Sequence, residues 1–198
     1  MGRAIQMDNA QASLSCAFTG HRPTRFAFKD DETHTSCIEL KQVIKRQIEH
    51  LYQCGVRRFY TGCALGVDMW AGETVLSLAE QCPHIELYSV VPFRGQETKW
   101  KPEQQKRYHD LLKRSNGVFV LNEGFTKDCY LERNRFLVDQ SDVLLAVYDE
   151  GAKKRSGTGY TVNYAKKGGK PILLIHPDTF QIHHSPFTPL FHPQKKNH

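Results

Sequence analysis

Short β-branched runs alternate with longer stretches of helical periodicity along this 198-residue chain, and this alternation is the feature that most constrains its fold. It is typical of an α/β protein in which helices cover a parallel sheet. The runs expected to form strands are 13–18, 56–60, 85–91, 117–121, 142–148 and 171–175. The expected helices are 36–53, 67–81, 101–114, 130–140 and 159–167. Because ligands bind beyond the carboxyl ends of such strands, the loops at that edge should carry the function.

The chain has the length of one domain with its own core. We expect residues 1–176 to form a single ligand-binding domain and residues 177–198 to form a C-terminal extension, because that segment has no clear apolar period. The adjacent His183 and His184 would point opposite ways in an extended chain, which makes a poor chelate. No metal site is therefore predicted.

Composition disfavours several classes of protein. No apolar run approaches the roughly 18 residues of a membrane helix, and the polar residues 1–11 lack the apolar region of a signal peptide. The six cysteines are scattered without a CxxC pair, as expected for reduced thiols in a cytoplasmic protein. The formal charge of +6 suits an anionic partner but does not identify one.

The most informative segment follows the second expected strand and leads into a helix. Its candidate ligand-binding residues are Gly62, Cys63, Ala64, Leu65 and Gly66. Glycines permit a tight turn and a close approach to a ligand, and the N–H groups at a helix start attract phosphate. The segment has neither the ending of a Walker loop nor the GxGxxG spacing of a dinucleotide fingerprint. A plain strand-to-helix turn is the alternative interpretation.

Two carboxylates lie in the helix that follows. Asp68 either favours the helix dipole or accepts hydrogen bonds from a ribose hydroxyl, since a phosphate held against it would be repelled. Glu73 lies further along the same helix. If the protein is an enzyme, Glu73 or Asp68 is the candidate catalytic carboxylate.

A second glycine segment follows the fifth expected strand and again begins a helix. Its candidate ligand-binding residues are Gly157, Thr158, Gly159 and Thr161, whose threonine hydroxyls can donate to phosphate. The basic residues 153–155 precede it, either as part of the site or as a solvated loop. Two such loops after parallel strands favour a shared anion-binding site.

The loop after the first expected strand adds Thr19, Gly20, His21 and Arg22 to the candidate ligand-binding residues. The imidazole of His21 can serve as a base or simply cap the loop, and Arg22 can pair with phosphate. Which role His21 has depends on an oriented partner that the sequence does not identify.

Further candidates are Pro92, Phe93 and Arg94 after the third strand, and Asn134 on a later helix. Phe93 or Trp100 can stack on a nucleobase, although aromatic residues more often belong to the core. Asn134 and the preceding Arg133 have apolar neighbours, so this polar pair either lines a pocket or faces solvent.

In combination, these segments resemble the YpsA-like family within the SLOG superfamily of Rossmann-like ligand-binding proteins, over about residues 14–175. The resemblance is carried by residues 19–23, 62–73, 92–93, Gln96, Glu97, Trp100, 133–142 and 157–158. It implies a Rossmann-like, doubly wound, mostly parallel sheet with helices on both faces. It also implies a pocket for nucleotides or nucleotide-derived signals of the NAD and ADP-ribose class, in a family that is often bacterial or phage-borne.

Two other branches of the superfamily suggest alternative functions for this chain. Its phosphoribohydrolases carry a PGGxGT motif followed by a glutamate, and residues 156–163 have neither that proline nor that glutamate. Its DNA-processing proteins bind single-stranded DNA, but no dense aromatic-and-basic stripe is visible here. We therefore expect a binding or sensing domain without a resident cofactor. The alternatives are hydrolysis of a nucleotide N-glycosidic bond and binding of single-stranded nucleic acid, and a homo-oligomer is compatible with each.

Overall fold

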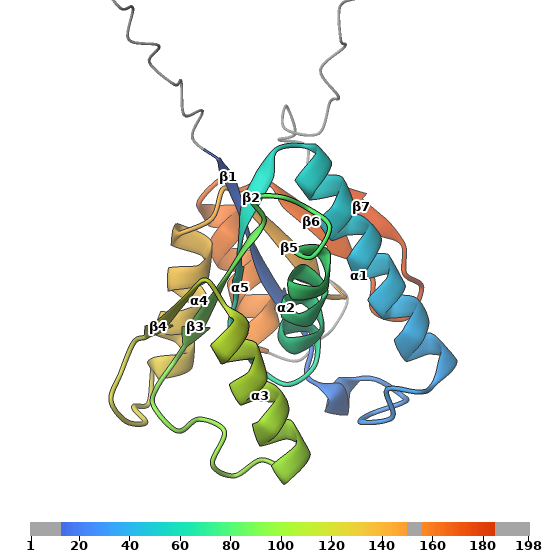
Figure 1. Cartoon of the computed structure of the whole chain (residues 1–198). Coiled ribbons are helices and arrows are strands. Elements are labelled where there is room, and N and C mark those ends of the chain that lie inside the picture. Colours follow the sequence, from blue (N-terminus) through green and yellow to red (C-terminus); the bar gives the residue numbers. More distant parts are fainter. Residues whose placement is uncertain (1–12, 150–155, 185–198) are drawn as a thin grey trace, which may run out of the picture.

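A computed structural model of the chain describes residues 13–149 and 156–184, which form one seven-stranded sheet with helices packed on it (Figure 1). Its strands are β1 (Leu14–Gly20), β2 (Val56–Thr61), β3 (Glu86–Val91), β4 (Gly117–Val120), β5 (Val143–Val147), β6 (Ile172–Ile175) and β7 (Ile182–His184). They lie in the order β4-β3-β2-β1-β5-β6-β7, and neighbours are parallel except β6 and β7, which are antiparallel. The predicted mostly parallel α/β sheet is confirmed.

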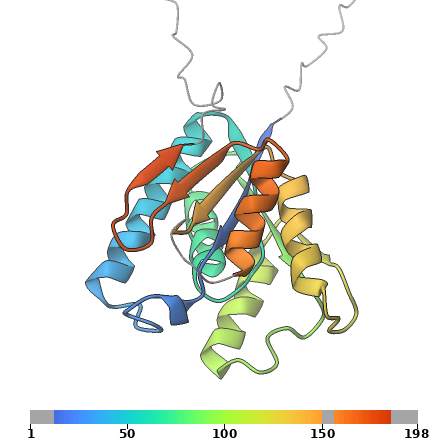
Figure 2. The same cartoon turned by 180° about the vertical axis from the view of Figure 1, so that it is seen from behind.

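The helices are α1 (Thr35–Gln53), α2 (Val67–Leu78), α3 (Pro102–Arg114), α4 (Cys129–Asp139) and α5 (Gly157–Lys167), and a short 3₁₀ turn, η1, spans Pro23–Arg25. Helices α1, α2 and α3 cover one face of the sheet, whereas α4 and α5 cover the other (Figures 1 and 2). The fold is therefore doubly wound, as predicted. None of the helices in the described ranges is long and apolar enough to span a membrane.

The central strand β1 explains why its sequence is apolar without interruption. Cys16 and Phe18 point into the core beneath α1 and α2, while Ala17 points into the core beneath α4 and α5. A strand covered on both faces needs apolar residues at successive positions, which is typical of parallel sheets. On the first face, the ring of Phe18 stacks on that of Phe59 from the neighbouring strand, with 5.7 Å between the ring centroids.

One strand was not expected from the sequence. Strand β7 lies inside the segment interpreted as a C-terminal extension, and its Ile182 pairs with Ile175 of β6. All of its residues are exposed, including His183 and His184. A three-residue strand has too few residues to produce a period of hydrophobicity, so its sequence carries no recognisable strand pattern.

Gly20 at the end of β1 sets how closely this strand approaches α2. A Cβ atom added at Gly20 would lie 2.4 Å from the Cβ of Val67, so we expect Gly20→Ala to destabilise the fold by about 1–3 kcal/mol through overpacking. Urea denaturation would measure the change. Gly124→Ala is the matched control because nothing lies within 4 Å of its added Cβ. Equal unfolding midpoints for the two variants would contradict this packing argument.

Candidate functional site

A cavity of about 730 Å³ opens at the carboxyl ends of the central strands. Strand order reverses between β1 and β5, because the chain winds outward from β1 in one direction and from β5 in the other. Ligands of doubly wound sheets bind at such a switch point. The lining residues are Thr19, Gly20, His21, Arg22, Arg25, Ala64, Asp68, Tyr130, Arg133, Asn134, Ser156, Gly157 and Thr158.

Arg133 is the buried side chain that joins α4 to the loop between β2 and α2. Its Nη1 donates to the carbonyl oxygen of Gly62 and lies 3.3 Å from Oδ2 of Asp68. Its Nε donates to Oδ1 of Asn134 at 2.9 Å. Both members of the ion pair are buried, with side-chain exposures of 7% for Arg133 and 8% for Asp68. The guanidinium therefore fixes the inner wall of the cavity.

The two glycines of this loop are required by close contacts. A Cβ atom at Gly62 would lie 1.8 Å from Nη1 of Arg133, so a side chain there would displace the guanidinium. Gly66 has a φ of +95°, and an added Cβ would lie 2.6 Å from the carbonyl oxygen of His21. Gly62 and Gly66 do not themselves line the cavity, so they shape the loop that presents Ala64 and Asp68.

Asp68 serves this loop as well as the cavity. Burial raises the pKa of Asp68, and this rise is only partly offset by the charges of Arg133 and Arg22 and by a backbone hydrogen bond from Ala64. The main-chain oxygen of Asp68 accepts a hydrogen bond of 2.7 Å from the hydroxyl of Thr61. Asp68 is thus bonded to the loop and also lies on the cavity wall, which leaves both interpretations of its role in place.

His21 has the oriented partner that the sequence did not identify. Its Nε2 lies 2.8 Å from Oδ1 of Asp149, whose Oδ2 accepts a 2.7 Å hydrogen bond from Arg25. Burial lowers the pKa of His21, and the contact with Asp149 opposes this shift. Burial alone would raise the pKa of Asp149, but the hydrogen bonds from Arg25 and His21 outweigh it and hold that pKa below its usual value.

The start of α5 is tied to β1 and to α4. The hydroxyl of Thr158 donates to the carbonyl oxygen of Gly20 at 2.9 Å, and Nδ2 of Asn134 donates to that of Gly157 at 3.4 Å. Ser156 is the N-cap, because its hydroxyl accepts a hydrogen bond of 3.0 Å from the amide of Gly159. These bonds hold the first turn of α5 against the cavity.

The structure brings together most, but not all, of the candidate ligand-binding residues. Nine of them line the cavity: Thr19, Gly20, His21, Arg22, Ala64, Asp68, Asn134, Gly157 and Thr158. Away from its lining are Gly62, Cys63, Leu65, Gly66, Pro92, Phe93, Arg94, Gly159 and Thr161. Sequence reasoning did not select Arg25, Tyr130 and Ser156, which also line the cavity. Arg133, for which it left a pocket-lining and a solvent-facing position open, lines the cavity as well. The basic residues 153–155 lie outside the described residues.

Specific contacts explain several of these placements. Cys63 is fully buried, and burial raises the pKa of its thiol to about 12. The hydroxyl of Thr161 donates to the carbonyl oxygen of Gly157 within the helix at 2.9 Å. Arg94 instead donates from Nε to Glu123 at 3.0 Å on the exposed loop after β3. The ring of Phe93 packs edge-on against Tyr130, with 5.8 Å between centroids, and so lies behind the ring that reaches the cavity.

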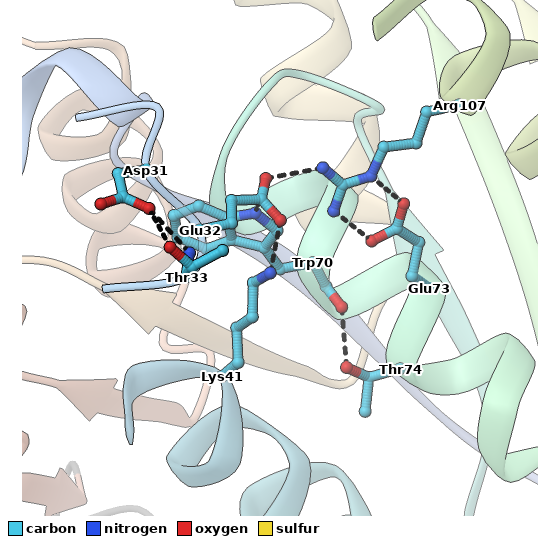
Figure 3. Close-up of polar contacts among 8 residues, drawn as sticks. All are labelled: Asp31, Glu32, Thr33, Lys41, Trp70, Glu73, Thr74 and Arg107. Carbon is cyan, nitrogen blue, oxygen red and sulfur yellow. Dashed lines mark hydrogen bonds and ion pairs between the residues drawn. The ribbon is translucent and has the colours of Figure 1, made fainter. Parts of the chain in front are cut away.

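Glu73, the other candidate catalytic carboxylate, lies in a different cluster between α2 and α3 (Figure 3). Arg107 donates to both of its oxygens. The same guanidinium donates to Oε1 of Glu32 at 2.6 Å, which also accepts from Nε1 of Trp70 at 2.8 Å. Glu73 is not part of the cavity lining, and this ion-pair network accounts for its carboxylate.

Comparisons with known proteins agree with this architecture. The YpsA family model, described as the YspA SLOG family, matches residues 16–180. The chain belongs to this family. A UPF0398 protein of Halalkalibacterium halodurans is 35% identical over 136 residues, which cover 68% of this chain and 71% of the relative. A UPF0398 protein of Bacillus thuringiensis is 32% identical over 161 residues, covering 78% and 83%. The predicted family resemblance is confirmed.

Solved structures of DNA processing protein A (DprA) share the fold of this YspA SLOG family member. The protein from Streptococcus pneumoniae superposes with a TM-score of 0.55 at 19% identity, and that from Helicobacter pylori with 0.54 at 20%. Each match covers 82% of this chain, but only 50% and 65% of the respective DprA chains. At these identities the likeness establishes the Rossmann-like fold and nothing finer.

The buried pair of Arg133 and Asp68 gives a pH-dependent prediction. Arg133→Met leaves a buried carboxylate without its cation, so we expect a loss of about 3–5 kcal/mol of unfolding free energy at neutral pH. Because burial already raises the pKa of Asp68 above its ordinary 3.8, the variant should regain stability as the pH falls through that raised value towards 3.8. Urea denaturation at several pH values measures this.

The double variant Arg133→Met/Asp68→Asn is the control for that pH dependence. It has no carboxylate at position 68, so its stability relative to the wild type should lack the recovery between neutral pH and pH 4 that the single variant shows. An Arg133→Met protein that is as stable as the wild type at neutral pH would refute the role given to this ion pair.

Proposed function

We propose that this protein binds a nucleotide-derived, phosphate-bearing ligand of the NAD and ADP-ribose class in the cavity at the switch point. The observation that carries the proposal is Arg22, an exposed cation on the cavity wall that makes no ion pair with any described residue. The other two arginines of the cavity are already paired, Arg25 with Asp149 and Arg133 with Asp68. A cavity of about 730 Å³ has the size of a small-molecule site.

Positive groups that line the cavity support the position we propose for the phosphate. Helix α5 begins at Gly157 with its N-terminus at the cavity, and the first N–H groups of a helix have no partner within it. Ser156 accepts from Gly159, which leaves the amides of Gly157 and Thr158 for a phosphate oxygen. Arg22 supplies the opposing charge-assisted hydrogen bonds.

We assign the remainder of the ligand to Tyr130 and Asp68, which also line the cavity. Tyr130 lines the cavity, and its ring is braced edge-on by Phe93, so it offers a rigid aromatic face for a nucleobase. The carboxylate of Asp68 suits a ribose hydroxyl, as the sequence suggested. We favour sensing without turnover, because Glu73 is paired with Arg107 outside the cavity and Asp68, the other candidate catalytic carboxylate, is paired with Arg133.

Single-stranded nucleic acid is the second candidate. The DprA of Helicobacter pylori, which shares this fold, has a described single-stranded DNA binding mode. In the present chain Phe125 is 68% exposed and contacts the rings of Phe93 and Tyr130, so an aromatic surface continues outward from the cavity. Stacking on such a surface is tolerant of base identity.

Thermal shift and calorimetry against NAD, ADP-ribose, nucleoside monophosphates and ribose 5-phosphate test the proposal. A ligand at about 100 times its Kd should stabilise the protein by roughly 2.7 kcal/mol. Arg22→Ala should weaken binding of every phosphate ligand by about tenfold or more, since a charge-assisted hydrogen bond is worth about 1.5–3 kcal/mol. Tyr130→Ala should weaken ADP-ribose binding and leave ribose 5-phosphate binding unchanged.

Arg94→Ala is the matched control for Arg22→Ala, because Arg94 is an exposed arginine on a neighbouring loop outside the cavity lining. It should bind like the wild type. If no compound in the set stabilises the protein and native mass spectrometry finds no co-purifying small molecule, the small-molecule proposal fails. Tight binding of oligonucleotides, with log affinity falling linearly with log salt concentration, would favour the second candidate instead.

A further inference from the structure

Strand β4 forms one edge of the sheet and is unusually apolar for that position (Figure 1). Its last three residues are exposed, by 42% at Val118, 41% at Phe119 and 39% at Val120. Edge strands of monomeric proteins are usually protected by charges, proline or a bulge, because their free backbone groups would otherwise pair with another strand. The sequence of β4 is Gly-Val-Phe-Val and contains none of the protecting residues.

The opposite edge of the sheet is different. It is formed by β7, which has three residues and carries the polar side chains of His183 and His184. A very short strand is one of the ordinary ways to protect an edge, and Ile182 is the single apolar residue of β7. Of these two edge strands, only β4 exposes a continuous run of apolar residues.

The backbone of β4 defines which groups face outward. The amide of Leu121, immediately after β4, donates to the carbonyl oxygen of Val91 in β3 at 3.0 Å. Successive residues of a strand direct their N–H and C=O groups to opposite sides. The backbone N–H and C=O of Phe119 therefore face β3, as those of Leu121 do. The N–H and C=O groups of Val118 and Val120 consequently face away from β3, and no strand in residues 13–149 and 156–184 pairs with them.

We propose that β4 pairs with β4 of a second copy of this chain, antiparallel and with the two-fold axis at Phe119. In this register Val118 of each copy lies opposite Val120 of the other, and each pair exchanges two backbone hydrogen bonds. All four outward N–H groups of the two strands are then satisfied. The only position that meets its own copy is Phe119, in a pair without backbone hydrogen bonds, where side chains approach most closely.

The side chains suit this arrangement on both faces of the sheet. Phe119 lies on the α4 face, with its ring 5.4 Å from that of Phe136, so two aromatic pairs meet across the axis. Val118 and Val120 lie on the opposite face and form two cross-strand valine pairs. Antiparallel pairing also brings the end of α3 towards Glu123 of the other copy; within each copy Arg114 lies 3.5 Å from Glu80 and Glu123 lies 3.0 Å from Arg94, so Lys113 is the cation at the end of α3 that is left for this contact. The contact is therefore apolar at its centre and complementary in charge at its ends.

The short strand predicts a weak association. Four residues per copy and the adjoining aromatic rings bury less than the standard interface of about 1,600 Å². We therefore expect a reversible dimer whose population rises with protein concentration. This inference rests on β4 alone and does not depend on the ligand proposed for the cavity.

Sedimentation velocity over a wide range of concentration is the primary test. The full chain should shift from monomer towards dimer, whereas Phe119→Lys and Val120→Pro should remain monomeric at every concentration. The proline removes only an outward N–H group, so it leaves the pairing with β3 intact. Ile38→Lys is the matched control, because Ile38 is 45% exposed on α1, which lies on the other side of the molecule from β4 (Figure 1). This variant should dimerise like the wild type.

Oxidative cross-linking tests the register. Phe119→Cys should form a disulfide-linked dimer, because residues directly opposite in such a pair have Cβ atoms about 4.5–5.5 Å apart and only small adjustments are needed for a disulfide. Val118→Cys should not cross-link to itself, because the two copies of residue 118 lie on a diagonal at about 7–8 Å. The wild-type protein, oxidised alongside, controls for its native cysteines.

Three results would overturn the proposal. The first is a wild-type chain that stays monomeric at all concentrations. The second is a dimer that persists undiminished in both Phe119→Lys and Val120→Pro while circular dichroism confirms that these variants are folded. The third is cross-linking of Val118→Cys in preference to Phe119→Cys, which would exclude the two-fold axis at Phe119.

Discussion

The candidate site depends on one buried guanidinium. Arg133 reaches from α4 to the loop after β2, where it contacts the carbonyl oxygen of Gly62 and the carboxylate of Asp68. Position 62 must be glycine because the guanidinium occupies the space of a Cβ atom. Asp68 must be acidic because an arginine buried without a counter-charge would be costly. Loop sequence, helix start and cavity wall are thus consequences of a single contact between elements far apart in the chain.

Hydrogen bonds extend this contact around the cavity. Arg133 holds Asn134, Asn134 bonds to Gly157 at the start of α5, and Thr158 bonds back to Gly20 at the end of β1. A buried ion pair contributes little net stability compared with apolar residues of the same volume. Its presence is better explained by positioning, because it fixes the inner wall of the cavity that Arg22 and the start of α5 also line.

The sequence predicts the elements and the glycine loops well because both are local signals. Periodicity identified the six parallel strands and the five helices, and the positions of Gly62 and Gly157 indicated the edge of the sheet at which the cavity opens. The order of the strands is not local. Strand β3 lies two positions from β1, about 10 Å away, so the loop carrying Phe93 and Arg94 does not reach the cavity lining.

Helix geometry explains two further differences. Asp68 and Glu73 are five residues apart, about 140° around a helix of 3.6 residues per turn, so they could not share one wall. That argument was available from the spacing alone. The sequence does not predict the direction of the Arg133 side chain, because a long side chain among apolar neighbours can bury its charge or extend it into solvent. Only the positions of Gly62 and Asp68 in the folded chain determine that this arginine points inward.

The two proposals are compatible because of the direction of the strands. Pairing β4 antiparallel with its copy extends the sheet while reversing its direction, so the carboxyl ends of the two sheets lie at opposite edges. Each cavity lies at the carboxyl end of β1, which is separated from the shared strand by β2 and β3. Neither copy can then complete the other's site, and a small ligand should bind each one independently. A nucleic-acid strand would have to cross the whole sheet to engage both cavities, which makes this dimer better suited to small ligands.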